Sequence, residues 1–330
     1  MSDGEAIPFW GPEQLELLHL MTQAVDPEGQ IPTAMQAAAP IEKRILLDPR
    51  FPRVDVRGEL TIRNLKDPEL GPEQLVDLAI QGPRSLDVLA KVVEPDSFLS
   101  DIARLRTFEL ASGTIASTAA TVARTGYTGE ELGYEMFVHP EKAPAVWNAL
   151  LEAGEEYGLR PAGLGARDSL RTEAGFPLHG HELAGPHAIN PIEAGYGGYV
   201  KLHKPFFTGR SQAIEWHKKR DRTVVRFEVD EKGGKVLRAG NPVLAGRKGQ
   251  YAGMVTSAIA TRERQVGLAI IDSKHAKEGG KLHILPVTGD DKAPPPRSPL
   301  ELSEGDWMTI PRQATILPRF MPQDEEPLPE

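Results

Sequence analysis

The sequence predicts an α+β fold that ends in a separate all-β domain, and three observations indicate it. Between Val76 and Glu173, runs with the two-residue period of strands alternate with runs of helical spacing, which predicts a split βαβ arrangement. After Arg220, short alternating runs are separated by glycine-containing turns, as in a small antiparallel β barrel. The composition, 40% hydrophobic and 26% charged over 330 residues, is typical of a globular chain of two or three domains.

The first strand and helix of the mixed region are expected near Val76. The segment 76–80 alternates apolar and polar residues as a half-buried strand does. A helix is predicted to open at Pro83, because proline suits the first helical turn, where its missing N–H group is not needed. Its apolar residues recur at helical spacing as Leu86, Leu89 and Val93. An earlier helix is expected over 12–24.

Two further strands and two helices complete this region. The segments 121–124 and 134–139 are expected as strands, and the second places Tyr134, Met136 and Val138 on one face and Glu135, Phe137 and His139 on the other. A helix is predicted over 141–157, with Val146, Trp147, Leu150 and Leu151 on its apolar stripe. The next helix, 165–173, ends at Gly175, which together with Pro177 suits a left-handed cap and stop.

The all-β region is expected to begin close to Arg220. Val225, Phe227 and Val229 alternate with Arg226, Glu228 and Asp230, which is the two-residue period of a strand. The predicted organisation is therefore an N-terminal segment 1–58, an α+β region 59–218, a β barrel 219–318 and an acidic, proline-rich tail 319–330.

The composition excludes several classes of chemistry. A chain with zero cysteines has no disulfide framework, thiolate nucleophile or cysteine-ligated metal centre. The formal net charge of -9 argues against nucleic acid as a partner, because phosphate backbones are held by clustered Lys and Arg. No apolar run approaches the roughly 20 residues of a membrane-spanning helix. With an acidic opening and no signal core, the expected location is the cytoplasm.

Four glycine-punctuated motifs occur in order between residues 122 and 195. They are Ala123-Arg-Thr-Gly-Tyr-Thr-Gly-Glu130, Gly163-Leu-Gly-Ala-Arg-Asp-Ser-Leu-Arg-Thr-Glu-Ala-Gly175, Leu178-His-Gly-His-Glu182 and Asn190-Pro-Ile-Glu-Ala-Gly195. Together they resemble the glycine-cleavage T-protein family of aminomethyltransferases and the related folate-dependent demethylases. The resemblance covers about residues 75–275 and implies a three-domain ring around a folate channel, with a ferredoxin-like middle domain and a C-terminal barrel.

The resemblance implies tetrahydrofolate as the cofactor and assigns three residues to its binding. Glu135 follows the Tyr-Thr-Gly-Glu turn and corresponds to the carboxylate that binds the amino-pyrimidine edge of the pterin, a task that suits paired charge-assisted hydrogen bonds. Arg167 corresponds to the folate-binding arginine, and Tyr127 to a tyrosine that lines the pocket. On the residues alone, a solvated Glu135, an anchoring Tyr127 and a surface network of Arg167 or Arg171 with Asp168 or Glu173 are the alternatives.

Other polar groups have two interpretations each. His179, His181 and Glu182 could be metal ligands, but the family uses the matching residues for packing and hydrogen bonding, so no metal is expected. The positive patch formed by Lys201, Lys204 and Arg210 could hold an anionic ligand tail or be a solvated loop.

The resemblance does not extend to the family's first domain. That domain carries an aspartate in an Ile-Leu-Asp-Asp context, and Ile45-Leu-Leu-Asp48 stands too close to Gln81-Gly-Pro to match it. The catalytic residue is therefore unknown; Asp48 is the one candidate, and we interpret it as a loop cap before Pro49. Residues 1–58 correspond to a truncated or divergent first domain. A second subunit that supplies the missing elements is hypothesised.

The implied function is the transfer of an aminomethyl or methyl group to folate N5. A lipoyl carrier protein would be the partner of an aminomethyltransferase, whereas an O-, N- or S-demethylase would take a small methylated donor directly. The segment Ala258-Ile-Ala-Thr-Arg-Glu-Arg-Gln, which replaces a Gly-x-x-Ser-Pro-Thr pattern, points to the demethylase branch. A non-catalytic folate-binding or assembly protein on the same fold is the alternative from another class.

Overall fold

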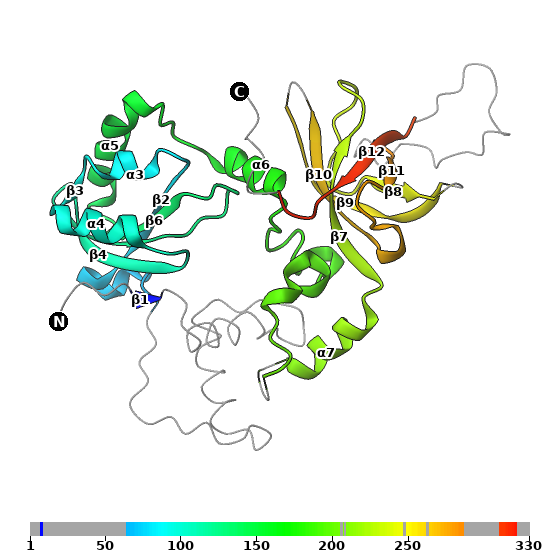
Figure 1. Ribbon diagram of the computed structural model, residues 1–330, viewed down its shortest axis with the longest axis horizontal. Coiled ribbons are helices and arrows are strands. Elements are labelled where there is room, and N and C mark those ends of the chain that lie inside the picture. The colour runs from blue at the N-terminus through cyan, green and yellow to red at the C-terminus, as the bar shows by residue number, and fades with distance from the viewer. Residues whose placement is uncertain are drawn as a thin grey trace. The chain divides into compact units, whose positions relative to one another are not determined.

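The computed structural model describes residues 7–8, 64–204, 207, 209–246, 249–261, 264–286 and 310–321. The helix expected over 12–24 and Asp48 lie outside these residues. The chain divides into two compact units. The first, called the sheet unit, comprises 1–126, 130–161 and 205–210; the second, called the barrel unit, comprises 127–129, 162–204 and 211–330 (Figure 1). These units differ from the predicted domains, whose boundaries remain a prediction.

The sheet unit contains a six-stranded antiparallel sheet. Its path runs β1-β4-β5-β6-β2, and β3 pairs with β4 outside that path. In the register, Glu135 lies opposite Ala79 of one neighbouring strand and Ala123 of the other. The strands are β1 (Ile7–Pro8), β2 (Val76–Gln81), β3 (Val93–Glu94), β4 (Glu109–Ile115), β5 (Thr118–Ala123) and β6 (Gly133–Val138).

The helices of the sheet unit cover one face of this sheet (Figure 1). They are α3 (Ser85–Leu89), α4 (Asp96–Arg104) and α5 (Ala143–Gly154), and α5 continues into the 3-10 turn η2 (Glu155–Tyr157). A further 3-10 turn, η1 (Pro68–Glu73), precedes β2 and has no buried residue. The predicted helix that included Val93 is wrong at its end, because α3 stops at Leu89 and Val93 pairs with Ile115 in the sheet. The two consecutive β-branched residues Val92 and Val93 favour the strand.

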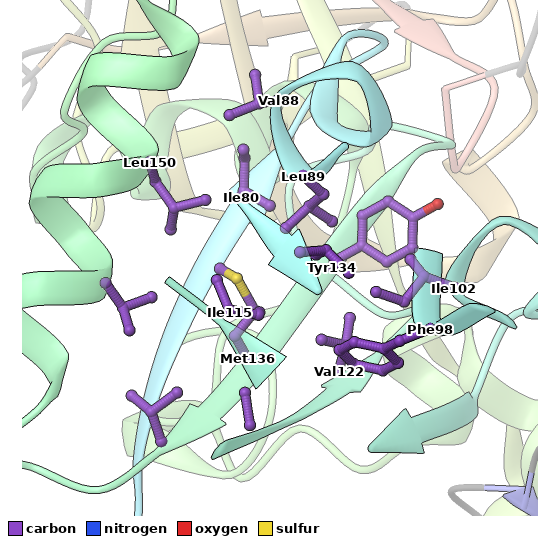
Figure 2. Packing of buried hydrophobic residues seen from close by; sticks show 14 residues of the cluster. Ile80, Val88, Leu89, Phe98, Ile102, Ile115, Val122, Tyr134, Met136 and Leu150 are labelled. Carbon is purple, nitrogen blue, oxygen red and sulfur yellow. The ribbon is translucent and has the colours of Figure 1, made fainter. Parts of the chain in front are cut away.

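The core of the sheet unit lies between the helices and the sheet. Figure 2 shows strand residues such as Ile80 and Met136 directed toward helical residues such as Leu89 and Leu150. The predicted burial of Tyr134, Met136 and Val138 is confirmed. The predicted stripe on α5 is correct for Val146 and Leu150, which are one helical turn apart, but wrong for Trp147, which is 37% exposed.

Replacement of Met136 by alanine is expected to destabilise the sheet unit strongly. Met136 is fully buried among apolar neighbours, so the substitution removes apolar contact and leaves a cavity, at a cost of about 2–5 kcal/mol. Trp147→Ala is the matched control, because the larger side chain of Trp147 is partly exposed and should cost less. Urea denaturation of both variants measures the two costs. An equal or greater loss in Trp147→Ala would contradict this packing.

The barrel unit contains a closed six-stranded antiparallel barrel with the order β10-β7-β12-β11-β8-β9. This confirms the predicted α+β class with a C-terminal barrel. Its interior is filled by apolar side chains such as Phe227, Val255 and Leu282. The strands are β7 (Arg222–Val229), β8 (Pro242–Ala245), β9 (Gln250–Ala260), β10 (Gln265–Asp272), β11 (Lys281–Ile284) and β12 (Arg312–Leu317), and η6 (Ser273–His275) follows β10.

The remaining elements of this unit precede the barrel in sequence. They are α6 (Leu164–Ala174), the 3-10 turns η3 (Gly185–His187) and η5 (Gly197–Tyr199), the π-helical turn η4 (Ile192–Tyr196), and α7 (Arg210–Lys219). The segment from η3 to η4 covers the outer face of the barrel, where Ile189 and Ala194 pack on Val224, Leu268 and Ile270. No helix among the described ranges is long and apolar enough to cross a bilayer.

The same covering layer buries a charged residue of β7. Arg226 alternates with Val225 and Phe227 of the barrel core, yet only 1% of it is exposed. It shares its face of the strand with Val224, which the covering layer buries. Both faces of β7 are therefore covered, and alternation of charged and apolar residues does not imply exposure there.

Candidate functional site

The C-terminal end of α6 is formed by a glycine cap. Gly175 has a left-handed backbone with φ 87°, which confirms the predicted cap. The Gly175 N–H donates to the Thr172 carbonyl at 3.1 Å, and the Phe176 N–H donates to the Arg171 carbonyl at 2.7 Å. This is the Schellman arrangement, which satisfies the last carbonyl groups and turns the chain away from the helix axis.

The tyrosine turn, residues 127–129, docks on this end of α6. The Tyr127 hydroxyl donates to the Pro177 carbonyl, and its ring lies 5.0 Å from the Phe176 ring, centroid to centroid. Gly129 packs so closely that a Cβ atom there would lie 2.5 Å from the Ala174 Cβ. The close approach and the φ of 94° at Gly129 both require glycine.

The hydroxyl groups of Tyr127 and Tyr196 form a directed pair. Their oxygens are 3.0 Å apart. Because the single Tyr127 hydroxyl proton goes to the Pro177 carbonyl, which can only accept, Tyr196 donates to Tyr127. Burial raises the pKa of both tyrosines above the ordinary value, most strongly for Tyr196, which also loses its donated hydrogen bond on ionisation. Both therefore act as neutral hydroxyls.

A segment after the last barrel strand contacts the same place. The Met321 N–H donates to the Ala174 carbonyl at 3.0 Å. The Arg319 guanidinium donates to the Gly175 carbonyl and, at 2.7 Å, to the Ala194 carbonyl. Burial lowers the pKa of Arg319 to about 10, so it is still cationic at neutral pH. The Phe320 ring stacks on Tyr196 at 5.7 Å with an interplanar angle of 14°.

Arg171 is the centre of a buried polar cluster on the inner side of α6. It is 1% exposed, and its guanidinium donates to Asp168 Oδ1 at 2.8 Å, Glu182 Oε2 at 2.7 Å and Ser257 Oγ at 2.8 Å. Glu182 is 0% exposed and also accepts from the Leu178 N–H at 3.0 Å. The cluster joins α6, the loop 178–182 and strand β9, so it fixes the helix on the barrel.

The motif Pro191-Ile-Glu is held by an ion pair. Glu193 is 8% exposed. Arg222 donates to both of its carboxylate oxygens, from Nε to Oε1 at 3.1 Å and from Nη2 to Oε2 at 3.2 Å. Its carboxylate also accepts from the Asn190 N–H at 3.1 Å. Glu193 therefore anchors the π-helical turn that carries Tyr196 to strand β7.

The three predicted binding residues lie in different surroundings. Tyr127 is half-buried in the barrel unit, as described above, and Arg167 is exposed on α6 in the same unit. Glu135 is half-buried on β6 in the sheet unit, on the face away from the helices. The structure brings Tyr127 to the C-terminal end of α6, whereas Arg167 lies two turns earlier on that helix.

The two histidines considered as metal ligands and the basic residues of the predicted positive patch lie as follows. His181 Nδ1 lies 3.4 Å from Ser257 Oγ, and His179 is exposed. Among the described residues, no group of three or more His, Cys, Asp or Glu side chains is arranged to hold a metal ion. Lys201 donates to the Gly198 carbonyl at 2.6 Å, and Arg210 begins α7.

Sequence reasoning missed three members of this site. Tyr196 directly follows the motif that ends at Gly195, and its place there was the available signal. Arg171 was considered only in a surface network, although it lies on the α6 face that continues toward Ala174. Arg319 was placed in a tail, and no sequence pattern indicated its contacts with residues more than 100 positions earlier.

The comparisons with known proteins agree with this architecture. Residues 66–204 match the model of the GCVT N-terminal domain family. The chain is 39% identical over 217 residues to an aminomethyltransferase of Caldanaerobacter subterraneus subsp. tengcongensis, covering 64% of this chain and 55% of that protein. It is 41% identical over 214 residues to an aminomethyltransferase of Alkaliphilus metalliredigens, covering 63% and 55%. The chain is thus related to the glycine-cleavage T-protein family.

A solved structure extends the T-protein likeness to the fold. Glycine cleavage system aminomethyltransferase T from Bartonella henselae superposes with a TM-score of 0.55 at 23% identity, over 74% of this chain and 59% of that chain. The predicted resemblance to T-protein transferases is confirmed, since the relatives are named aminomethyltransferases. The chain spans a little over half the length of these relatives.

Proposed function

We propose that this chain is a tetrahydrofolate-dependent one-carbon transferase, which moves an aminomethyl or methyl group to folate N5. The observation that carries the proposal is the meeting of all four sequence motifs at the C-terminal end of α6. Tyr127 comes from the first, Gly175 from the second, Glu182 from the third and Ala194 from the fourth, which Tyr196 directly follows. These residues are far apart in sequence, and the contacts that hold the tyrosine turn at the end of α6 bring them together.

The residues present suit the chemistry of folate. A carboxylate such as that of half-buried Glu135 accepts two N–H groups side by side, as an amino-pyrimidine offers them. An exposed guanidinium such as that of Arg167 fits a carboxylate or the face of a planar ring. Neutral Tyr127 contributes an aromatic surface and, since its proton is committed to Pro177, only an acceptor. Tetrahydrofolate itself would supply the nucleophilic N5 atom.

The donor of the one-carbon unit separates two versions of the proposal. An aminomethyltransferase would receive its donor on a lipoyl carrier protein, and a demethylase would take a small O-, N- or S-methylated molecule. The segment 258–265, which points to the demethylase, contacts α6, because Arg264 pairs with Glu173 at 2.6 Å.

The catalytic acid or base is not assigned, and Asp48 remains a candidate. A second subunit that completes the site is part of the proposal.

Calorimetric titration with tetrahydrofolate tests the binding step. Glu135→Gln and Arg167→Ala are each expected to weaken binding about tenfold or more, because each removes hydrogen bonds made by a charged group. Glu152→Gln on α5 and Arg160→Ala, both at exposed positions, are the matched controls and should bind as the parent does.

The titration also separates the alternatives. Unchanged affinity in both site variants would contradict the assignment of Glu135 and Arg167. A parent chain that does not bind tetrahydrofolate would contradict the proposal for the chain alone. Binding without turnover of either donor class, with and without a lipoyl carrier protein, would favour a non-catalytic folate-binding protein.

A further inference from the structure

The segment 319–321, called here the C-terminal clamp, contacts the second and fourth motifs and the aromatic residues that directly follow them. Arg319 bridges the Gly175 carbonyl at the end of α6 and the Ala194 carbonyl of the π-helical turn. Phe320 lies between the rings of Phe176, at 6.2 Å, and Tyr196, at 5.7 Å. The clamp therefore connects the helix cap to the turn that carries Tyr196.

The position of Arg319 is favourable in charge and in shape. Carbonyl groups at the C-terminus of a helix carry partial negative charge and attract a cation. A planar guanidinium can donate to two carbonyls at once, which an ammonium group cannot do with the same geometry. The guanidinium carbon also lies 4.5 Å from the centroid of the Phe320 ring, in a cation–π contact.

Arg319 is not presented to a ligand. Both of its Nη atoms donate to backbone carbonyls. Its Nε atom is buried and has no hydrogen-bond partner within the described ranges. A Cβ atom at Gly195 would lie 3.0 Å from this Nε, so the backbone of the turn closes over it. Any influence on a ligand must pass through the residues that Arg319 holds.

We propose that Arg319 is a positioning residue: through the C-terminal clamp it holds Tyr196 in place, and Tyr196 in turn directs the Tyr127 hydroxyl. The order of donors supports this step, because Tyr196 donates to Tyr127 and Tyr127 donates to Pro177. Loss of the clamp frees the Tyr196 ring and leaves Tyr127 without the donor that fixes it. The effect on folate binding rests on the proposed function, but the effect on the tyrosines does not.

Nitration of tyrosine by tetranitromethane, read residue by residue by mass spectrometry, tests the clamp. In the parent, Tyr251, which is 60% exposed, is the reactive reference, and Tyr134, which is 1% exposed, reports on the fold of the sheet unit. Arg319→Gln is expected to nitrate Tyr196 about tenfold faster relative to Tyr251, as loss of a charge-assisted hydrogen bond raises the locally open population. An unchanged rate overturns the proposal.

Arg312→Gln is the matched control. Arg312 also lies at the last barrel strand and donates to two backbone carbonyls, those of Lys235 at 3.0 Å and Glu231 at 2.8 Å. It should leave Tyr196 protected. Equal exposure of Tyr196 in this variant would show general loosening of the barrel and would overturn the clamp.

A second variant decides the case if Arg319→Gln fails to fold, which nitration of Tyr134 would reveal. Phe320→Leu keeps Arg319 and removes the ring stacked on Tyr196. Faster nitration of Tyr196 in the folded variant supports the clamp, and retained protection overturns it.

Folate titration of the same proteins separates the two proposals. A parent that does not bind tetrahydrofolate, with Tyr196 exposed in Arg319→Gln, contradicts the proposed function and leaves the clamp standing. A parent that binds, with about fivefold weaker binding in Arg319→Gln, supports both. Equal binding by parent and Arg319→Gln, despite an exposed Tyr196, overturns the positioning role.

Discussion

Arg171→Met is expected to lower the free energy of unfolding by about 3–5 kcal/mol, because it leaves a buried carboxylate without its cation. Glu182 is 0% exposed, and its Oε2 atom forms an ion pair with Arg171 Nη1 at 2.7 Å. Its other oxygen, Oε1, has no hydrogen-bond partner in the part of the chain that the structure describes. The methionine side chain fills similar space but donates nothing, so the buried Glu182 carboxylate would keep only the Leu178 N–H as a donor and no cation.

Chemical denaturation of three variants measures this effect. Arg167→Met, one turn earlier on the same helix, is the control, and since Arg167 is exposed its stability should change by less than about 0.5 kcal/mol. The double variant Arg171→Met with Glu182→Gln should recover part of the loss, since it removes the unpaired charge. A cost below about 1 kcal/mol for Arg171→Met would mean that water reaches Glu182, contrary to its burial.

The sequence predicted those features that depend on local spacing. Alternation located β6 and the burial of Tyr134, Met136 and Val138, and the glycine at 175 marked the end of α6. Local spacing also produced the errors. Trp147 and Val93 fit a helical stripe by residue type, but the angle around α5 and the β-branched pair at 92–93 decided otherwise.

Contacts between distant segments could not be predicted in this way. Arg171 and Asp168 have the spacing of an ordinary surface pair, and only the approach of Ser257, 86 residues later, and of Glu182 makes the arginine a buried residue. The burial of Arg226 has a similar cause, since it depends on the layer that covers the barrel. The residues that local spacing could not identify are therefore those whose contacts come from distant segments of the chain.

Gly129→Ala is expected to detach the tyrosine turn from α6 and to weaken tetrahydrofolate binding about tenfold or more. The new methyl group would lie 2.5 Å from the Ala174 Cβ, a distance at which one of the two backbones must move. The turn carries Tyr127, so movement there breaks its hydrogen bonds with Pro177 and Tyr196. The positive φ of 94° adds strain of about 1 kcal/mol for a residue with a Cβ atom.

Gly240→Ala separates the steric effect from the effect of the backbone angle. Gly240 has a similar φ of 86°, but a Cβ atom there would meet nothing within 4 Å. Both variants should therefore lose the roughly 1 kcal/mol of stability that comes from the backbone, while only Gly129→Ala should lose ligand affinity and expose Tyr127 to nitration. Equal ligand affinity in the two variants would show that the contact of the turn with α6 does not position Tyr127, and the meeting of the motifs would lose its functional meaning.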